Sequence, residues 1–366
     1  MFENNTYTDV IPFLKSLGAE TEIVDEITII NKFSSVESEL FSLNYGVGLR
    51  LMNNLSILEM RGADSLDFLH RISTNTIKNL NKEEIRQTIF VSQKGRILGV
   101  ASVINFEGYL LLVTNSLNRQ KIIGWINKFI IGDDVKISDA SHRFDLYEIS
   151  GPQSDSFMSL LVGNSISDIS ENYFKVVNIE GILVFLSKFK DVKGDNKFWI
   201  IAEPLKGKQL ISYMLENKGP FDFNLVGEAA NKIYNVEHGI PSEPFELNDL
   251  YNPYEAKMTE LIDNNKGCYI GQEVITRLNT YDKVQKNLVG LYFSGDVIPS
   301  DSFSLLDDQQ NEVGSVTSIA YSPRMKRNLA LAYVKKAHSA HGTKLTAKNG
   351  SRSLDVIVSD LPFSKH

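Results

Sequence analysis

The sequence predicts an α+β protein with antiparallel sheets and a small all-β domain near its C-terminus. Between about residues 55 and 236, short β-like runs alternate with single amphipathic helices, which is typical of mixed α+β construction. No GxGxxG loop and no GxxxxGK loop is present, so nothing favours a doubly wound nucleotide-binding sheet. After about residue 284 the helical periodicity ends and only short β-like runs follow, which indicates a small β-barrel or sandwich.

Each expected element follows from local periodicity. Strands are predicted at 55–60, 88–92, 97–104, 110–114, 144–150, 182–187 and 198–202. Helices are predicted at 63–73, 116–130, 206–217 and 225–236. Asp64 or Ser65 is the expected N-cap of the first helix, and Ser116 that of the second. Gly239 is expected to end the last helix.

Five further strand-like runs follow residue 284: LVGLYFS, SFSLL, EVGSVTS, LALAYV and LDVIV. The preceding stretch is rich in Pro, Asn and acidic residues, and is expected to be an ordered connector rather than part of a core. The predicted organisation is therefore an N-terminal α+β region of two interleaved lobes at 1–238, the connector at 239–283, and a C-terminal barrel at 284–366.

Composition narrows the classes of function. The 366 residues include 38 Lys plus Arg and 45 Asp plus Glu, and the net charge of −7 argues against nucleic acid or a membrane surface as the primary partner. Cys268 is the only cysteine, which excludes an internal disulfide and an all-cysteine metal or iron–sulfur site. No apolar run approaches the roughly 18 residues that span a bilayer, and the first residues resemble neither a signal nor a transit peptide. A soluble, cytoplasmic protein is expected.

The most informative stretch is KGCYIGQE at 266–273. Within eight consecutive residues it contains a thiol, an aromatic ring, an amide, a carboxylate and two glycines. These residues are Lys266, Gly267, Cys268, Tyr269, Ile270, Gly271, Gln272 and Glu273. Glycine permits close backbone approach and tight turns. Lys266 could lower the pKa of the Cys268 thiol and so raise its reactivity. The alternative is that Cys268 is a small buried hydrophobic residue.

This octapeptide resembles the hallmark of the YgfZ-type folate-binding proteins, a branch of the superfamily that contains the aminomethyltransferase (T-protein) of the glycine cleavage system. Similar segments occur in the same order along the chain: RGADSLDFLHRISTN at 61–75, YEISGPQS at 147–154, EHGIPSEPFELNDLYNPYEAKM at 237–258 and VGSVTSIAYSPRMKRNLALAYV at 313–334. The resemblance covers about residues 12 to 340. It implies an aminomethyltransferase-like, three-lobed ring of antiparallel α+β domains around a channel that binds folate.

The resemblance also implies a role and a cofactor. YgfZ-type proteins are associated with assembly or repair of iron–sulfur proteins, including enzymes that modify tRNA. The expected cofactor is tetrahydrofolate or a one-carbon derivative, with no permanently bound metal. The expected partners are folate and an iron–sulfur client or assembly protein, with no direct nucleic acid and no membrane.

The sequence departs from the aminomethyltransferases at three places. The carboxylate that they carry near the reacting folate nitrogen aligns with Gly99, and no Asp or Glu occurs from 93 to 104, which argues against aminomethyltransferase chemistry. The arginine expected near the folate glutamate tail is Asn235. The folate-reading loop matches KFKDVKGDN at 188–196, where Asp195 could face the pterin or simply be an exposed loop residue.

Several other side chains are candidates with a simpler structural alternative. Tyr45, Tyr254 and Trp199 could stack on a pterin, although a structural role is favoured for each, and Trp125 is expected to pack within its helix. Arg277 could face an anionic ligand or pair with Glu273. A metal site at His338 and His341 is not expected. The basic cluster at 324–327 and 335–336 is either a solvated face or a docking patch for an acidic partner.

The preferred hypothesis is a YgfZ-type protein that binds a reduced folate and uses Cys268 to support iron–sulfur protein maturation. One alternative is a folate-dependent one-carbon transferase of the aminomethyltransferase type. Another is an interaction scaffold that no longer binds folate, marked by Asn235 and the altered 188–196 loop.

Overall fold

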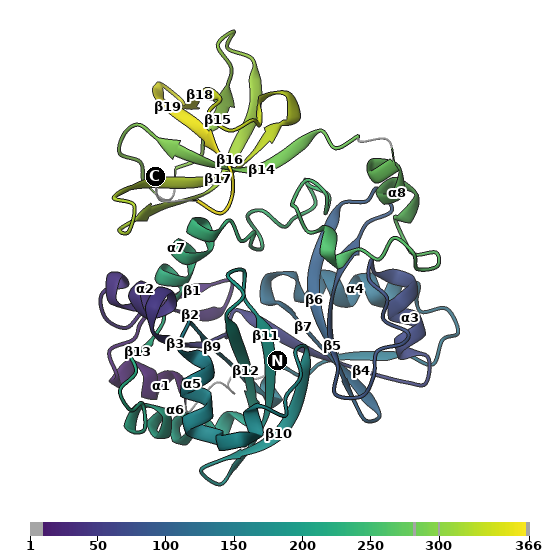
Figure 1. Ribbon diagram of the computed structural model, residues 1–366. Coiled ribbons are helices and arrows are strands. Elements are labelled where there is room, and N and C mark those ends of the chain that lie inside the picture. Colours follow the sequence, from purple (N-terminus) through teal and green to yellow (C-terminus); the bar gives the residue numbers. More distant parts are fainter. Residues whose placement is uncertain (1–9, 281–282, 299–300, 364–366) are drawn as a thin grey trace. The chain divides into compact units, whose positions relative to one another are not determined.

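The computed structural model describes residues 10–280, 283–298 and 301–363 (Figure 1). These residues form two compact units, and the chain passes between them several times. Unit one contains the described residues up to 68, with 77–86 and 101–231. Unit two contains 69–76, 87–100 and the described residues from 232 onward. Among the described helices, none has the length and apolar character that crossing a membrane requires.

Unit one contains a six-stranded sheet in the order β10-β11-β12-β9-β3-β13. Its strands, in that order, are Tyr173–Ile179, Ile182–Lys190, Asn196–Ala202, Asp145–Ser150, Val47–Leu51 and Phe223–Leu225. All neighbours are antiparallel except β13, which runs parallel to β3. One face packs on the helices α1 (Val10–Ser16), α5 (Ser154–Val162) and α6 (Gly207–Glu216), and their apolar side chains form one core with the sheet. Burial of this apolar face stabilises the unit.

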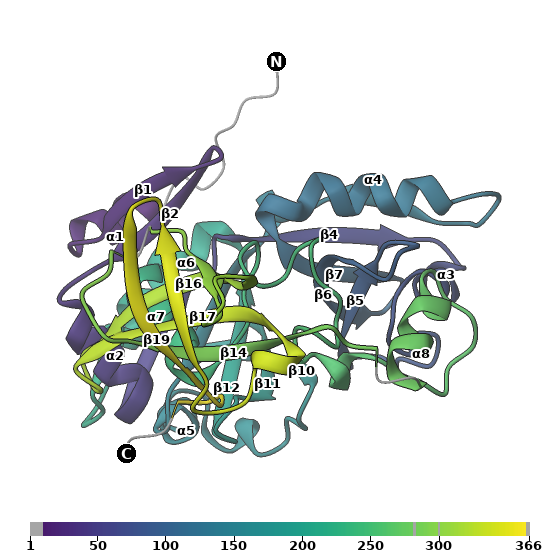
Figure 2. The same cartoon turned by 90° about the horizontal axis from the view of Figure 1, so that it is seen from above.

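A five-stranded sheet follows the order β5-β6-β7-β4-β8. Its strands, in that order, are Ile85–Val91, Ile97–Phe106, Tyr109–Asn115, Leu55–Arg61 and Lys136–Asp139. The helix α3 (Ser65–Ile72) follows β4, and α4 (Arg119–Phe129) runs along the sheet, as Figure 2 shows. Within unit one, the second face of the six-stranded sheet shares a core with this sheet, including Phe106, Leu111 and Trp199. Two further elements precede β3: the hairpin of β1 (Glu20–Val24) and β2 (Ile27–Lys32), and the helix α2 (Val36–Tyr45).

The elements predicted between residues 55 and 236 are present within a few residues of their expected bounds. The helix α7 spans Glu228–His238 and ends before Gly239, whose φ is +69°. The predicted cap of α4 is wrong, because α4 begins at Arg119 and is preceded by a short 3-10 turn at Ser116–Asn118. That turn is capped by Asn115, whose side chain accepts a hydrogen bond from the Leu117 amide.

The C-terminal domain is a closed barrel in the order β14-β17-β16-β15-β18-β19. Its strands, in chain order from β14 to β19, are Lys286–Phe293, Ser304–Leu306, Glu312–Ser322, Arg327–Lys335, Lys344–Asn349 and Arg352–Ser359. Five of the six correspond to the runs predicted from sequence, and β18 is the strand that was not predicted. Its sequence, KLTAKN, places only Leu345 and Ala347 in the barrel core, so its alternation is too weak to stand out. The protein is thus an α+β fold with antiparallel sheets and a C-terminal β-barrel.

The interpretation of 239–283 as a connector outside the core is wrong. Tyr251, Ala256, Leu261, Tyr269 and Ile275 are buried in the core of unit two. The stretch also contains the helix α8 (Gln272–Thr280). Its polar composition misleads because its carboxylates are buried with partners of their own, which sequence periodicity does not reveal.

Candidate functional site

The KGCYIGQE motif occupies the turn that leads into α8 in unit two. Gly271 has a φ of +82°, and a Cβ at this position would lie 2.5 Å from the Ser92 carbonyl oxygen. Any other residue would be strained and would clash with the end of β5. Glycine is therefore required here by the fold of the chain itself.

Lys266 is buried, and its ammonium is the anchor of this turn. Its Nζ donates hydrogen bonds to the carbonyl oxygens of His70 at 2.5 Å, Ser73 at 2.6 Å and Asn75 at 2.7 Å. The His70 carbonyl belongs to the last turn of α3, where carbonyls lack partners within the helix. The Lys266 donors are thus engaged by the backbone of residues 70–75.

Tyr269 anchors the other side of the turn. Its ring is buried in the core of unit two, and the Lys266 Nζ lies 5.0 Å from the ring centroid. Burial raises the pKa of the Tyr269 hydroxyl well above its ordinary value, with smaller contributions from Tyr254 and Asp263. Tyr269 thus stays neutral and acts as a packing residue.

Cys268 is exposed between these two buried side chains. This position excludes the alternative in which it is a small buried hydrophobic residue. A Cβ added at Gly267 would have no described atom within 4 Å, and the φ of Gly267 lies outside the left-handed region. The thiol and the backbone before it are therefore open to an approaching molecule, while the residues on both sides are fixed.

The end of the motif lies on α8. Glu273 and Arg277 are both exposed, and Arg277 Nη2 lies 2.8 Å from Glu273 Oε1 in an i,i+4 ion pair. The pairing alternative for Arg277 is thus the one that the structure shows. Gln272 is half-buried at the first position of the helix.

The proposed folate-facing residues are distributed over both units. In unit two, Tyr254 packs against the core and its hydroxyl donates to Asn264 Oδ1 at 3.3 Å. Asn235 is half-buried on α7 and accepts a backbone hydrogen bond from Ile240. In unit one, Asp195 is half-buried in the β11–β12 turn, 3.7 Å from Lys193 Nζ, and Tyr45 is half-exposed at the end of α2.

Trp199 takes part in a polar row that the sequence analysis missed. Arg50, Glu148 and Trp199 are directly opposite one another on β3, β9 and β12. Glu148 accepts from Arg50 Nη2 at 3.2 Å and from Trp199 Nε1 at 3.2 Å, and Arg50 Nη1 also lies 3.1 Å from Glu228. Burial would raise the pKa of Glu148, but Lys197, Arg50 and these hydrogen bonds lower it to about 2. The burial of Trp199 favours its structural alternative. In the sequence, this row could have been recognised from Arg50 and Glu148, which are charged residues within otherwise apolar strands.

A second missed residue is Glu243. Its Oε1 accepts a hydrogen bond of 2.7 Å from the Val100 amide, next to the Gly99 position where the aligned carboxylate is missing. The sequence around Gly99 contains no acid, but the fold of unit two brings one there from a segment 143 residues further along the chain. Local sequence could not reveal this, because the two segments meet only in the folded unit.

The remaining candidates have internal partners. Trp125 packs edge-to-face on Phe129 with centroids 4.7 Å apart. In the predicted basic cluster, Arg324 Nε lies 3.2 Å from the buried Glu237, and the Arg327 guanidinium lies 4.2 Å from the Tyr292 ring centroid. His341 lies 3.6 Å from Asp360. Among the described residues, no group of three His, Cys, Asp or Glu is arranged to hold a metal ion.

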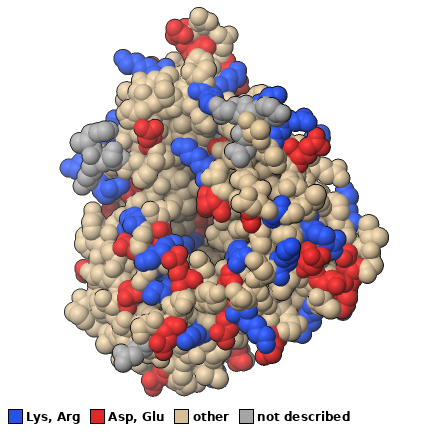
Figure 3. Space-filling model, turned by 45° about the vertical axis from the view of Figure 1, so that its right-hand side comes forward, with Lys and Arg blue, Asp and Glu red and all other residues tan. Residues whose placement is uncertain are grey.

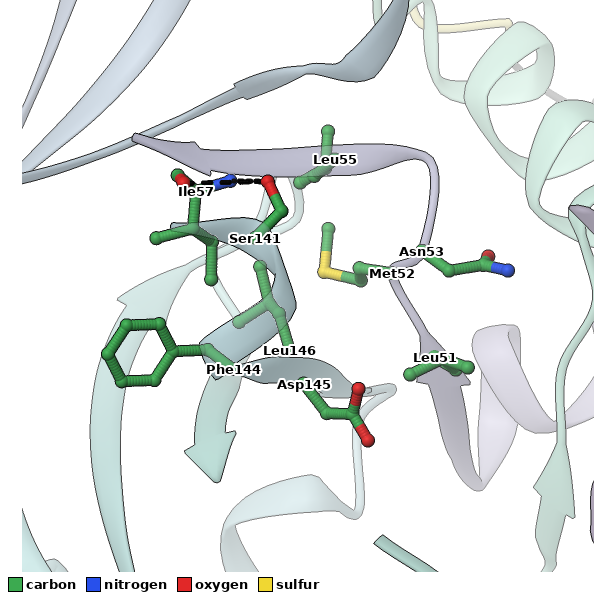
Figure 4. A pocket seen from close by; sticks show the side chains of 9 residues that line it. All are labelled: Leu51, Met52, Asn53, Leu55, Ile57, Ser141, Phe144, Asp145 and Leu146. Carbon is green, nitrogen blue, oxygen red and sulfur yellow. Dashed lines mark hydrogen bonds between the residues drawn. The ribbon is translucent and has the colours of Figure 1, made fainter. Parts of the chain in front are cut away.

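A small cavity lies inside unit one beside β9. It measures about 10 Å³, which is room for about one water molecule. Figure 4 shows the nine side chains that line it, among them Ser141, which is hydrogen-bonded to the Ile57 backbone, and Asp145. Asp145 accepts from the Tyr147 hydroxyl at 2.9 Å, while its Oδ1 is buried and finds no partner among the described residues. Burial raises the pKa of Asp145 to about 6. The cavity is too small for an organic ligand.

The surface charges are mixed. Over the described part of the face drawn in Figure 3, Lys and Arg side chains lie among Asp and Glu side chains. This mixture matches a chain in which both signs are abundant and the net charge is modest for its length.

Comparison with known proteins agrees with this fold. The sheets and the barrel define an aminomethyltransferase-like α+β protein: the aminomethyltransferase T of the glycine cleavage system from Bartonella henselae superposes with a TM-score of 0.84 over 96% of both chains, at 18% identity. Residues 10–266 match the family model of the GCVT N-terminal domain, and residues 286–365 match that of the glycine cleavage T-protein C-terminal barrel domain. The chain therefore belongs to the glycine cleavage T-protein family.

Individual relatives are distant but extend over most of the chain. A chloroplastic protein of Arabidopsis thaliana that is named as a transferase is 26% identical over 96% of this chain and 79% of its own length. The aminomethyltransferase of Halalkalibacterium halodurans is 28% identical over 91% of both chains. That of Caldanaerobacter subterraneus is 25% identical over 91% of this chain and 89% of its own.

Proposed function

We propose that this protein is a YgfZ-type, folate-binding accessory protein that supports the assembly or repair of iron–sulfur proteins, including enzymes of tRNA modification. The observation that carries the proposal is the exposed Cys268 thiol within KGCYIGQE, held between a buried lysine and a buried tyrosine. A thiol fixed at the surface can reach a site on another protein, whereas a buried one cannot.

The chemistry of one thiol limits what the protein can do alone. A single cysteine can supply one ligand to a cluster or form one mixed disulfide with a partner thiol, but it cannot hold a cluster. Cys268 is the only cysteine of the chain, so the remaining ligands must come from the client. Membership of the T-protein family supports folate as the small-molecule ligand, with Tyr254 and Asn235 of unit two as proposed contacts.

The first experiment replaces Cys268 with Ala and measures client maturation. Because Cys268 is exposed, we expect the variant to keep the thermal midpoint of the parent within about 2 °C, since exposed substitutions change stability little. Maturation of an iron–sulfur client in a strain that lacks the native protein should fall to the level of the empty vector. Full maturation with the alanine variant would contradict the role of the thiol.

The second experiment tests folate by anaerobic calorimetric titration with tetrahydrofolate and its methylene form. Saturable micromolar binding, about −8 kcal/mol, supports the folate-dependent accessory function. Absence of binding in the parent, with binding gained in Asn235→Arg, supports instead the scaffold that has given up folate, because arginine restores a bidentate donor for a carboxylate.

One observation favours a second candidate function, a folate-dependent one-carbon transferase. Glu243 supplies a carboxylate at β6 where the local sequence has none, and a carboxylate can stabilise the cation that develops in one-carbon transfer. Turnover of tetrahydrofolate with an amine donor would support it, provided that Glu243→Gln abolishes turnover while folate affinity is retained. Absence of turnover in the parent would reject this candidate.

A further inference from the structure

We infer that Lys266 is the positioning residue for Cys268, because its ammonium fastens the Cys268 turn to the C-terminal end of α3. The role of the Cys268 thiol in this inference is the one given by the proposed function. The attachment itself rests on the hydrogen bonds from Nζ to the carbonyl oxygens of His70, Ser73 and Asn75.

The end of α3 needs such a partner. The last four carbonyls of a helix have no intrahelical donor. Here the Leu69 carbonyl accepts from the Ser73 hydroxyl at 2.8 Å, that of His70 from Lys266, and that of Arg71 from the Ile270 amide at 3.2 Å. Two of these three donors come from the Cys268 turn, one on each side of the thiol. The helix end and the turn therefore complete each other.

An ammonium fits this position better than any other side chain. Three acceptors converge on one nitrogen, and only the protonated amine presents three N–H groups. A guanidinium holds its donors in a flat fork and cannot point three of them to one centre. Burial lowers the pKa of Lys266 to about 7, and Asp263 opposes this shift. The three carbonyl oxygens and the negative end of the α3 dipole also favour the charged form.

Lys266 controls the part of the segment that carries the thiol. The earlier part, 261–263, has its own hydrogen bonds: Thr74 Oγ1 to the Leu261 carbonyl at 2.7 Å, and the Asp263 amide to the Thr74 carbonyl at 3.1 Å. These remain when Lys266 is replaced. Between Asp263 and Ile270, the Lys266 ammonium supplies three hydrogen bonds to residues 70–75. Loss of the ammonium should therefore loosen 264–269 and leave the rest of unit two in place.

The single cysteine makes a local test possible. A nitroxide spin label is attached to Cys268 in the full chain, and its mobility is measured at 25 °C in the parent, in Lys266→Met and in Lys94→Met. Lys94 is an exposed lysine in the β5–β6 turn and serves as the matched control. We expect label motion to be about threefold faster in Lys266→Met, which reports motion on the nanosecond timescale, and unchanged in Lys94→Met.

A merely structural role would lower the thermal midpoint without changing label motion in the folded protein, and that result would overturn the inference. If Lys266→Met does not fold, Lys266→Arg keeps the charge with the wrong donor geometry, and an unchanged label in that variant would overturn it equally. The unlabelled Lys266→Met protein should still titrate one thiol per chain, yet support client maturation about tenfold less well. Label motion is measured without a client. Full maturation with Cys268→Ala would therefore reject the proposed function without testing the attachment of the turn by Lys266.

Discussion

The two glycines of KGCYIGQE have different physical causes. Gly271 is demanded by the protein, since its φ is left-handed and the Ser92 carbonyl occupies the space of a Cβ. Gly267 is demanded by neither its φ nor its described neighbours, because a Cβ there would meet open space. Any requirement for glycine at 267 therefore comes from a partner molecule that approaches this backbone from outside the chain.

Alanine substitution separates the two glycines. Gly271→Ala should destabilise the protein by about 2–4 kcal/mol, because it combines left-handed strain with a backbone clash. Gly267→Ala should change stability by less than about 0.5 kcal/mol, yet lower client maturation at least severalfold, because a methyl group would stand beside the thiol. Thermal denaturation and the maturation assay check both. A Gly267→Ala protein with full maturation would show that no partner approaches this backbone.

At the scale of elements, sequence periodicity predicted the structure wherever a strand or helix has one apolar face. It succeeded for β4, β7 and four of the helices, whose apolar residues repeat at the expected spacing. It failed for β18, where only two residues face the core, and for 251–275, where buried residues such as Tyr251, Ala256 and Tyr269 follow no regular spacing. The motif turn was found because it is contiguous. The attachment to 70–75 and the approach of Glu243 to Val100 were not, since each joins segments far apart in the chain.

The buried acids of the 239–258 segment hold unit two together. Glu246 is fully buried and accepts from the Ser242 amide and hydroxyl, both at 3.1 Å, and from the Ser318 hydroxyl of the barrel at 2.7 Å. Glu255 accepts from the Asn252 amide and from Arg96. Carboxylates placed in this way link the segment to the barrel and to the β5–β6 hairpin.

Replacing Glu246 should therefore cost far more than replacing an exposed acid of the same region. Glu246→Ala leaves three donors without an acceptor and should destabilise by about 3 kcal/mol, whereas Ser318→Ala, which removes one hydrogen bond, should cost about 1 kcal/mol. Glu273→Ala, which breaks an exposed ion pair on α8, should change stability by less than about 0.5 kcal/mol. Urea denaturation of the three variants checks the order, and equal losses for Glu246→Ala and Glu273→Ala would contradict it.

For the whole molecule, two buried carboxyls on β9 make stability depend on pH with opposite signs. The pKa of Glu148 is lowered in the folded state to about 2, so its contribution is present above the unfolded pKa near 4.5 and is lost as pH falls toward 2. The pKa of Asp145 is raised to about 6 from an ordinary value of 3.8. The folded state therefore binds the extra proton between those values, and stability is lost as pH rises from about 4 to 6. Above pH 6 the molecule carries the full cost of a buried, half-satisfied carboxylate.

Asp145→Asn removes that cost without removing the acceptor for Tyr147. At pH 7.5 we expect the variant to be more stable than the parent by about 1–2 kcal/mol, which is less than the full shift of about two pKa units because the new amide group lacks an acceptor. At pH 5 the parent carboxyl is already largely protonated while Glu148 stays ionised, so the stabilisation should disappear. Thermal denaturation of both proteins from pH 5 to 8 measures the difference. A gain that is equal at both pH values would show that Asp145 is ionised throughout this range, and that the loss of stability with rising pH has another origin.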